Sequence, residues 1–170
     1  MAHNMKPQKT SKKQKNSILV VDDELHMRKI IMAACRKNGH ICFEAGSGDA
    51  ALNILKEKRI DLVITDIEMP GITGIQLTKK VKALKGPDVI MITGYAMDFS
   101  YGEAIAKGAS DFIQKPFEQK ELLIRIKRVF RERALRIELK ERLEQVMAAL
   151  EGVIHALSLS IDARDPYTAG

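Results

Sequence analysis

Acidic, hydroxyl and amino side chains follow four short apolar runs of this chain. Asp22 and Asp23 end the run ILVVDD, Asp66 ends LVITD, Thr93 ends VIMIT, and Lys115 ends FIQK. In a parallel α/β sheet such strand ends meet at one edge, where ligands bind. Carboxylates brought together there repel one another, and a bound divalent cation would offset that repulsion. Oxygen ligands suit Mg²⁺, and a neighbouring ammonium can pair with a phosphoryl oxygen, so the pattern predicts a magnesium and phosphate site.

Each of these residues also has an ordinary structural explanation. Residues 22–24 could cap the following helix, Asp66 could begin the turn at residues 69–71, and Lys115 could be a surface lysine. For any single residue the ordinary explanation is the stronger one. Four of five strand ends that deliver matched polar groups to one edge favour a functional site instead.

A sheet must position these side chains, and the apolar pattern predicts one. Strands that are buried on both faces are continuous apolar runs, because helices cover both sides of a parallel sheet. Segments with helical apolar spacing alternate with these runs, which is typical of βα units. The fourth such helix is expected before Lys107, with Tyr95, Phe99 and Tyr101 near its start. The pattern therefore predicts a (βα)5 unit over residues 17–132, with strands at 17–21, 40–44, 62–65, 89–93 and 111–114.

One long helix is expected after the last strand. Residues 117–161 contain no proline and one glycine, which predicts about 44 helical residues and about 66 Å of length. Apolar residues at 139, 143, 146, 150, 153 and 157 alternate steps of four and three, the spacing of a coiled coil, and Leu135 adds a stutter. This helix is expected to pair with a second copy or with the next domain; the alternative is a helix that packs only on its own domain.

Charge and cysteine usage exclude several classes of protein. The net charge is +6, but five lysines in residues 1–16 supply most of it, so this segment is expected to be a disordered tail. Nothing after residue 132 is typical of a helix-turn-helix, and no nucleic-acid partner is expected. Cys35 and Cys42 lack metal-site spacing and are expected to be reduced thiols. The sequence has neither a membrane span nor a signal peptide, which predicts a cytoplasmic protein without a membrane partner.

Four motifs together resemble a known family. The segments ILVVDDE, DLVITDIEMPGITGIQL, VIMITGY and GASDFIQKPF, in this order, are similar to the receiver domain of two-component response regulators. The resemblance covers residues 17–132 and implies a flavodoxin-like, doubly wound sheet of five parallel strands in the order 2-1-3-4-5. It implies that Asp66 accepts a phosphoryl group from a histidine kinase or phosphotransfer protein. It also implies that Asp23 and Asp66 bind Mg²⁺ directly, that Asp22 helps through water, and that the Glu68 backbone carbonyl is a further ligand.

The same resemblance assigns the switch residues. Thr93 and Phe112 match the family's hydroxyl and aromatic switch positions, and Lys115 matches its active-site lysine, followed by a cis proline at Pro116. The implied consequence is that phosphorylation draws in the Thr93 hydroxyl and lets Phe112 turn inward. The signal would then pass through a coiled-coil helix at residues 133–161, which is expected to make the protein a homodimer.

The end of the chain resembles a second family. The segment VIHALSLSIDARDPYTAG is similar to the opening of HD-GYP domains, so residues 162–170 are expected to be the truncated start of such an effector. This implies that the full protein is a metal-dependent cyclic di-GMP phosphodiesterase, although the chain itself is a phosphoacceptor and not an enzyme. Two alternatives stay open, a regulator with a different effector and an aspartate-nucleophile phosphatase. The phosphatase is disfavoured because Ile67-Glu68 follows Asp66 where a D-x-D motif is required.

Overall fold

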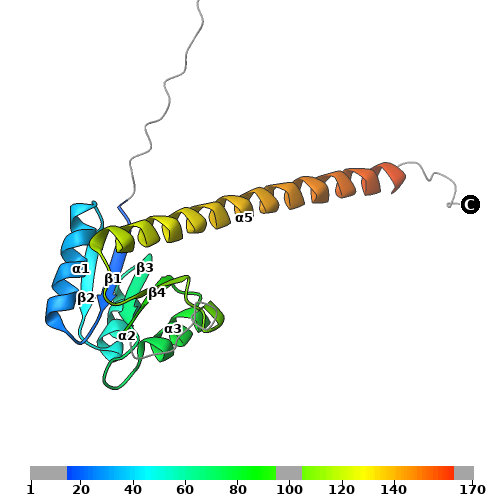
Figure 1. Ribbon diagram of the computed structural model, residues 1–170. Helices are drawn as coiled ribbons and strands as arrows, with labels where there is room; N and C mark the ends of the chain where they lie inside the picture. The colour runs from blue at the N-terminus through cyan, green and yellow to red at the C-terminus, as the bar shows by residue number, and fades with distance from the viewer. Residues whose placement is uncertain (1–14, 95–104, 163–170) are drawn as a thin grey trace, which may run out of the picture. The chain divides into compact units, whose positions relative to one another are not determined.

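The structure is a computed structural model that describes residues 15–94 and 105–162 of the chain, with side chains described through residue 159 (Figure 1). The predicted tail and the predicted HD-GYP start fall almost wholly outside these residues, and so does most of the predicted fourth helix. The described chain divides into one unit that ends at Val129 and another that begins at Phe130.

Five parallel strands form the sheet of the first unit, in the order β2-β1-β3-β4-β5. The predicted sheet and its order are confirmed. The strands β1, β3 and β4 are buried along their whole length, because their Ile, Leu and Val side chains meet helices on both faces. The strands are β1 Ser17–Val21, β2 Ile41–Ala45, β3 Leu62–Asp66, β4 Asp88–Thr93 and β5 Asp111–Gln114.

Within the described residues, three amphipathic helices connect the strands, and two of them begin at side-chain caps. They are α1 Leu25–Lys37, α2 Gly48–Glu57 and α3 Gly74–Ala83. The Ser47 hydroxyl accepts a hydrogen bond from the backbone N–H of Ala50, and Thr73 and Gln76 form a reciprocal capping box. These caps satisfy backbone N–H groups that have no partner within the helix, so α2 and α3 each start at a defined residue, whereas the α1 N-cap residue Glu24 makes no side-chain cap bond.

The helix α5, Gln119–Asp162, runs for 44 residues and confirms the predicted single long helix (Figure 1). Within the first unit, its residues Leu122, Ile126 and Val129 are buried at helical spacing. From Leu135 onward the large apolar side chains are exposed, among them Leu139, Leu143, Val146, Leu150, Val153 and Leu157. The coiled coil that this spacing predicts stays a prediction.

Candidate metal centre

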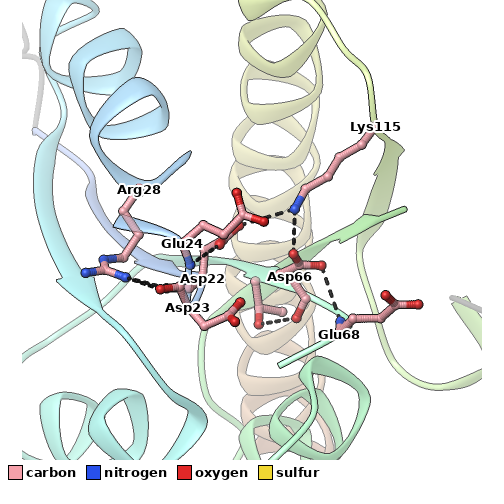
Figure 2. A network of polar contacts seen from close by, with 8 residues as sticks. Asp22, Asp23, Glu24, Arg28, Asp66, Glu68 and Lys115 are labelled. Atoms are coloured by element: carbon pink, nitrogen blue, oxygen red, sulfur yellow. Dashed lines mark hydrogen bonds and ion pairs between the residues drawn. The ribbon is translucent and has the colours of Figure 1, made fainter. Parts of the chain in front are cut away.

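Three carboxylates meet at the carboxyl edge of the sheet. Asp22 and Asp23 follow β1, Asp66 ends β3, and the two strands are hydrogen-bonded neighbours in the sheet. Each residue offers one carboxylate oxygen, and these oxygens lie within 4.8 Å of one another (Figure 2). Asp22 and Asp66 are buried and Asp23 is exposed, so the cluster is open to solvent on the Asp23 side. The convergence expected from the strand ends is therefore present.

Lys115 reaches the same cluster from the end of β5. Its Nζ lies 2.5 Å from Asp66 Oδ2 and 3.5 Å from Asp22 Oδ2 (Figure 2). Its backbone N–H donates to the Thr93 carbonyl at 2.7 Å, which ties the end of β5 to the end of β4. The peptide bond between Lys115 and Pro116 is cis, as expected. Three carboxylates and one ammonium thus share the pocket.

Burial and neighbouring charge act in opposite directions on this pocket. Burial alone would lower the pKa of Lys115, but the hydrogen bond and charge of Asp66, together with the charge of Asp22, raise the pKa overall. Burial raises the pKa of Asp22, although the Glu24 N–H and the Lys115 ammonium partly offset this effect. Lys115 therefore stays an ammonium near neutral pH, and the ionised form of Asp22 is less favoured than that of a solvent-exposed aspartate.

The backbone after β3 places the Asp66 carboxylate at the edge. Asp66 Oδ1 accepts a hydrogen bond from the Glu68 N–H at 3.3 Å. Gly71 has a φ of 76°, which allows the chain to turn away from the edge. A side chain at Gly74 would collide with the backbone carbonyl of Asp66, so α3 can begin this close to β3 only with glycine. The predicted role of the Glu68 carbonyl as a metal ligand stays a prediction.

The two predicted switch residues lie on neighbouring strands. Thr93 ends β4, is buried, and donates from its hydroxyl to the Gly94 carbonyl at 3.2 Å. Phe112 lies on β5 and is half-buried, with the Arg125 guanidinium of α5 6.0 Å from the centre of its ring. Arg125 also pairs with buried Asp111 at 3.1 Å. The structure brings both residues near the edge, and their switch roles stay predictions.

Three residues that matter here were not predicted as site residues. Arg28 donates hydrogen bonds to the carbonyls of Asp22 and Asp23, Gly74 contacts Asp66, and Arg125 lies over Phe112. An arginine one helical turn after Asp-Asp-Glu is a weak sequence signal, because arginines on exposed helix faces are common. Their importance depends on contacts between distant segments, which spacing along the chain does not reveal.

The donor set fits a hard divalent cation. Among the described residues, the cluster consists of carboxylates without a sulfur or imidazole ligand. An arrangement of few carboxylates beside open solvent suits Mg²⁺, which keeps waters and binds phosphate oxygens. Asp23 and Asp66 would hold the ion directly, with Asp22 assisting. The ion would supply positive charge for the oxygens of a bound phosphoryl group.

This fold and edge define the class of protein. A flavodoxin-like sheet in the order β2-β1-β3-β4-β5, with three carboxylates and a lysine at one carboxyl edge, is the CheY-like architecture. Residues 18–127 match the family described as response regulator receiver domain, and the chain belongs to this family.

Similar proteins agree with this assignment. The transcriptional regulatory protein ResD of Bacillus subtilis is 32% identical over 114 residues, which are 67% of this chain and 48% of ResD. The DNA-binding response regulator MtrA of Mycobacterium tuberculosis is 34% identical over 110 residues, 65% of this chain and 48% of MtrA. The crystal structure of FixJ-N superposes with a TM-score of 0.62 at 32% identity and covers 68% of this chain and 94% of FixJ-N.

The relatives are longer than this chain, and one of them bears on the expectation of no nucleic-acid partner. The chain spans about half the length of the curated relatives it matches. The prediction of no nucleic-acid partner has no support from them, because MtrA is by name a DNA-binding regulator. Among the described residues, no helix has the length and apolar character needed to cross a membrane.

Proposed function

We propose that this chain is a phosphoacceptor that receives a phosphoryl group from a histidine kinase or phosphotransfer protein on Asp66, in a Mg²⁺-dependent reaction in the cytoplasm. The observation that carries the proposal is the position of the Asp66 carboxylate, which lies at an open edge between two further acids and Lys115. A carboxylate that served only to start a turn would not require two further acids and a lysine beside it.

The chemistry is an in-line transfer between two nucleophiles. A carboxylate oxygen of Asp66 bonds to phosphorus while the bond between phosphorus and the donor's imidazole nitrogen breaks, and its electron pair stays on that nitrogen. Lys115, which now contacts Asp66 Oδ2, is placed to pair with a transferred phosphoryl oxygen. The exposed side at Asp23 leaves a path for the incoming group.

An apolar surface beside Lys115 supports a protein as the phosphodonor. Met27 and Ile30 of α1 and Pro116 and Phe117 after β5 line a cavity of about 360 Å³ next to the lysine. Apolar side chains concentrated at a pocket mouth are typical of a docking surface. A histidine-containing helix docked there would bring its imidazole to the edge that holds Asp66.

The signal would leave the site through Thr93 and Phe112 toward α5, as the family resemblance implies. The exposed apolar positions of α5 support pairing with a second copy, and therefore a homodimer.

The output that the chain's last residues favour is an HD-GYP phosphodiesterase. The alternative is a different effector, which the DNA-binding relative MtrA keeps open. The sequence encoded after Gly170 separates the two, because HD-GYP metal ligands must follow it.

Phosphorylation of the full chain by acetyl phosphate tests the phosphoacceptor role. Intact-mass measurement is expected to show one added phosphoryl group in the presence of Mg²⁺ and none with EDTA. Asp66→Asn is expected to abolish the addition, whereas Asp49→Asn, a change at an exposed acid of α2, leaves it intact. Multiple turnover of small phosphoesters would instead support the phosphatase alternative and contradict the proposal.

A further inference from the structure

Arg28 of α1 holds the backbone that carries the first two acids. Its Nη1 donates to the carbonyl of Asp22 at 2.7 Å and to the carbonyl of Asp23 at 3.2 Å (Figure 2). The same guanidinium donates from Nε to Glu44 Oε2 of β2 at 3.2 Å. The Arg28 side chain is only 14% exposed, and its bond to the Asp22 carbonyl is partly buried, whereas the bonds to Asp23 and Glu44 lie at the surface.

The two carbonyls belong to the connection whose carboxylates form the metal site. Holding two successive peptide groups restricts the direction of the Asp22 and Asp23 side chains. Other bonds also hold this short connection: the Asp22 N–H donates to the Ala45 carbonyl at 3.3 Å, the Glu24 N–H to Asp22 Oδ1 at 2.8 Å, and the Arg28 N–H to the Glu24 carbonyl at 3.2 Å. Lys115 Nζ reaches Asp22 Oδ2 at 3.5 Å. Without Arg28, the Asp23 carbonyl would lose its hydrogen bond from Nη1.

The surroundings of Arg28 hold its guanidinium in place. Glu44 accepts from one side, and Gly46, which follows β2, lies beside the guanidinium on another, where a Cβ would be in ordinary contact with Nη1 at 3.4 Å. Because Glu44 balances the charge of Arg28, the influence of the arginine on the acids is geometric. A guanidinium presents several donors in one rigid plane, which a lysine ammonium does not reproduce.

We propose that Arg28 is a positioning residue of the phosphoacceptor site: by binding the main-chain carbonyls of Asp22 and Asp23, it sets the two carboxylates for the divalent cation. The inference rests on the proposed function, because the cation belongs to that site. Groups that orient metal ligands typically change metal affinity by about 10- to 100-fold when they are removed.

Calorimetric titration of the full chain with Mg²⁺, without a phosphodonor, tests this inference. Arg28→Gln and Arg28→Lys are both expected to weaken Mg²⁺ binding by about tenfold or more, because neither keeps the planar fork. Glu44→Ala is expected to weaken binding less, since it only loosens the arginine. Lys29→Gln, on the exposed side of the same helix, is the matched control and leaves the affinity unchanged.

A kinetic measurement separates positioning from loss of structure. With acetyl phosphate, the Arg28 variants are expected to need more Mg²⁺ for half-maximal phosphorylation while the rate at saturating Mg²⁺ stays close to that of the wild type. If the Arg28→Lys variant binds Mg²⁺ as tightly as the wild type, the inference is overturned. It is also overturned if the Arg28 variants show a lower maximal phosphorylation rate but need the same Mg²⁺ concentration for half-maximal phosphorylation. A wild-type chain that binds no Mg²⁺ overturns the proposed function as well, so the two failures are distinguishable.

Discussion

At the scale of single residues, the acids that would bind a cation also destabilise the metal-free protein. Three carboxylates whose oxygens lie within 4.8 Å repel one another, and the structure offers Lys115 as their shared counter-charge. Burial further disfavours the ionised form of Asp22 and raises its pKa. Such an arrangement is expected where acids must bind a cation, because the metal-free protein then carries an unfavourable charge pattern that the ion relieves.

Asp23→Asn tests this opposition. Without Mg²⁺ the substitution is expected to raise the free energy of unfolding by up to about 1 kcal/mol, because it removes one of three like charges at an exposed position. Added Mg²⁺ is expected to stabilise the wild type, since a ligand that binds only the folded state shifts the equilibrium, and to stabilise the variant much less. Urea unfolding in EDTA measures the free energy of unfolding without metal, and urea unfolding in Mg²⁺ measures how much the ion stabilises each protein. An equal response of the two proteins to Mg²⁺ contradicts the assignment of Asp23 as a ligand.

At the scale of elements, close packing and one ion-pair cluster position the site. The start of α3 lies against the end of β3, so the backbone around Asp66 has little freedom. At the other end of the unit, Asp111 of β5 pairs with Arg125 and Arg128 of α5 at 3.1 and 3.0 Å. Because Asp111 is fully buried, these pairs attach the first turns of α5 to the sheet.

Gly74→Ala is expected to disturb Asp66 directly. The added Cβ would overlap the Asp66 carbonyl, and backbone cannot move aside as a flexible side chain would, so a loss of about 1–3 kcal/mol of folding free energy is expected. Gly94→Ala is the control, because a Cβ at that position meets nothing within 4 Å. Urea unfolding gives the stabilities, and acetyl phosphate gives the phosphorylation rates. A Gly74→Ala protein as stable as Gly94→Ala would contradict the packing described.

Asp111→Asn tests the attachment of α5. Removing the buried charge leaves two arginines without their shared partner, and because those arginines are partly exposed, a moderate loss of about 1–3 kcal/mol is expected. Amide hydrogen exchange is expected to quicken at residues 119–129 more than in β1 or β3. Uniform exchange across the unit would show that Asp111 contributes to general stability and does not anchor the helix.

At the scale of the whole molecule, the two units differ in how far their large apolar side chains are exposed to solvent. In the first unit the large apolar side chains are mostly buried, whereas from Leu135 to Leu159 they are exposed along α5. The coiled-coil seam is the row of apolar residues at 139, 143, 146, 150, 153 and 157. Met147 and Ile154 lie beside this seam and widen the apolar face of the helix. A face of this kind is unfavourable in water, which is the physical reason to expect a second helix against it.

Leu150→Glu is expected to prevent association of the full chain. A charge at the centre of the seam would be desolvated on pairing, so the molar mass measured by light scattering should fall from that of a dimer to that of a monomer. Ala148→Glu places the same charge away from the seam and is expected to leave the mass unchanged. Repeating the measurement with a beryllofluoride mimic shows whether pairing depends on phosphorylation. A wild-type chain that is monomeric under both conditions contradicts the seam.

The sequence by itself determined the elements and the edge of the sheet at which the acids and Lys115 meet. The continuous apolar runs of β1, β3 and β4 predicted buried parallel strands, and their final residues predicted which acids would meet, because strand ends in a parallel sheet share one edge. The lack of helix-breaking residues predicted α5. The strand β2 was displaced by one residue, since an edge strand with half-exposed side chains has a weaker apolar pattern. The strands β3 and β4 are each one residue longer than predicted.

Only the tertiary structure decided the contacts that support the site. Arg28 acts on the carbonyls of Asp22 and Asp23 because α1 and β2 lie beside the same connection. Gly74 matters because α3 starts against β3. Hydrophobic periodicity reports which face of an element is buried, but it does not report which donor in one segment meets which acceptor in another. Those pairings depend on the packed arrangement of elements that are distant in the chain.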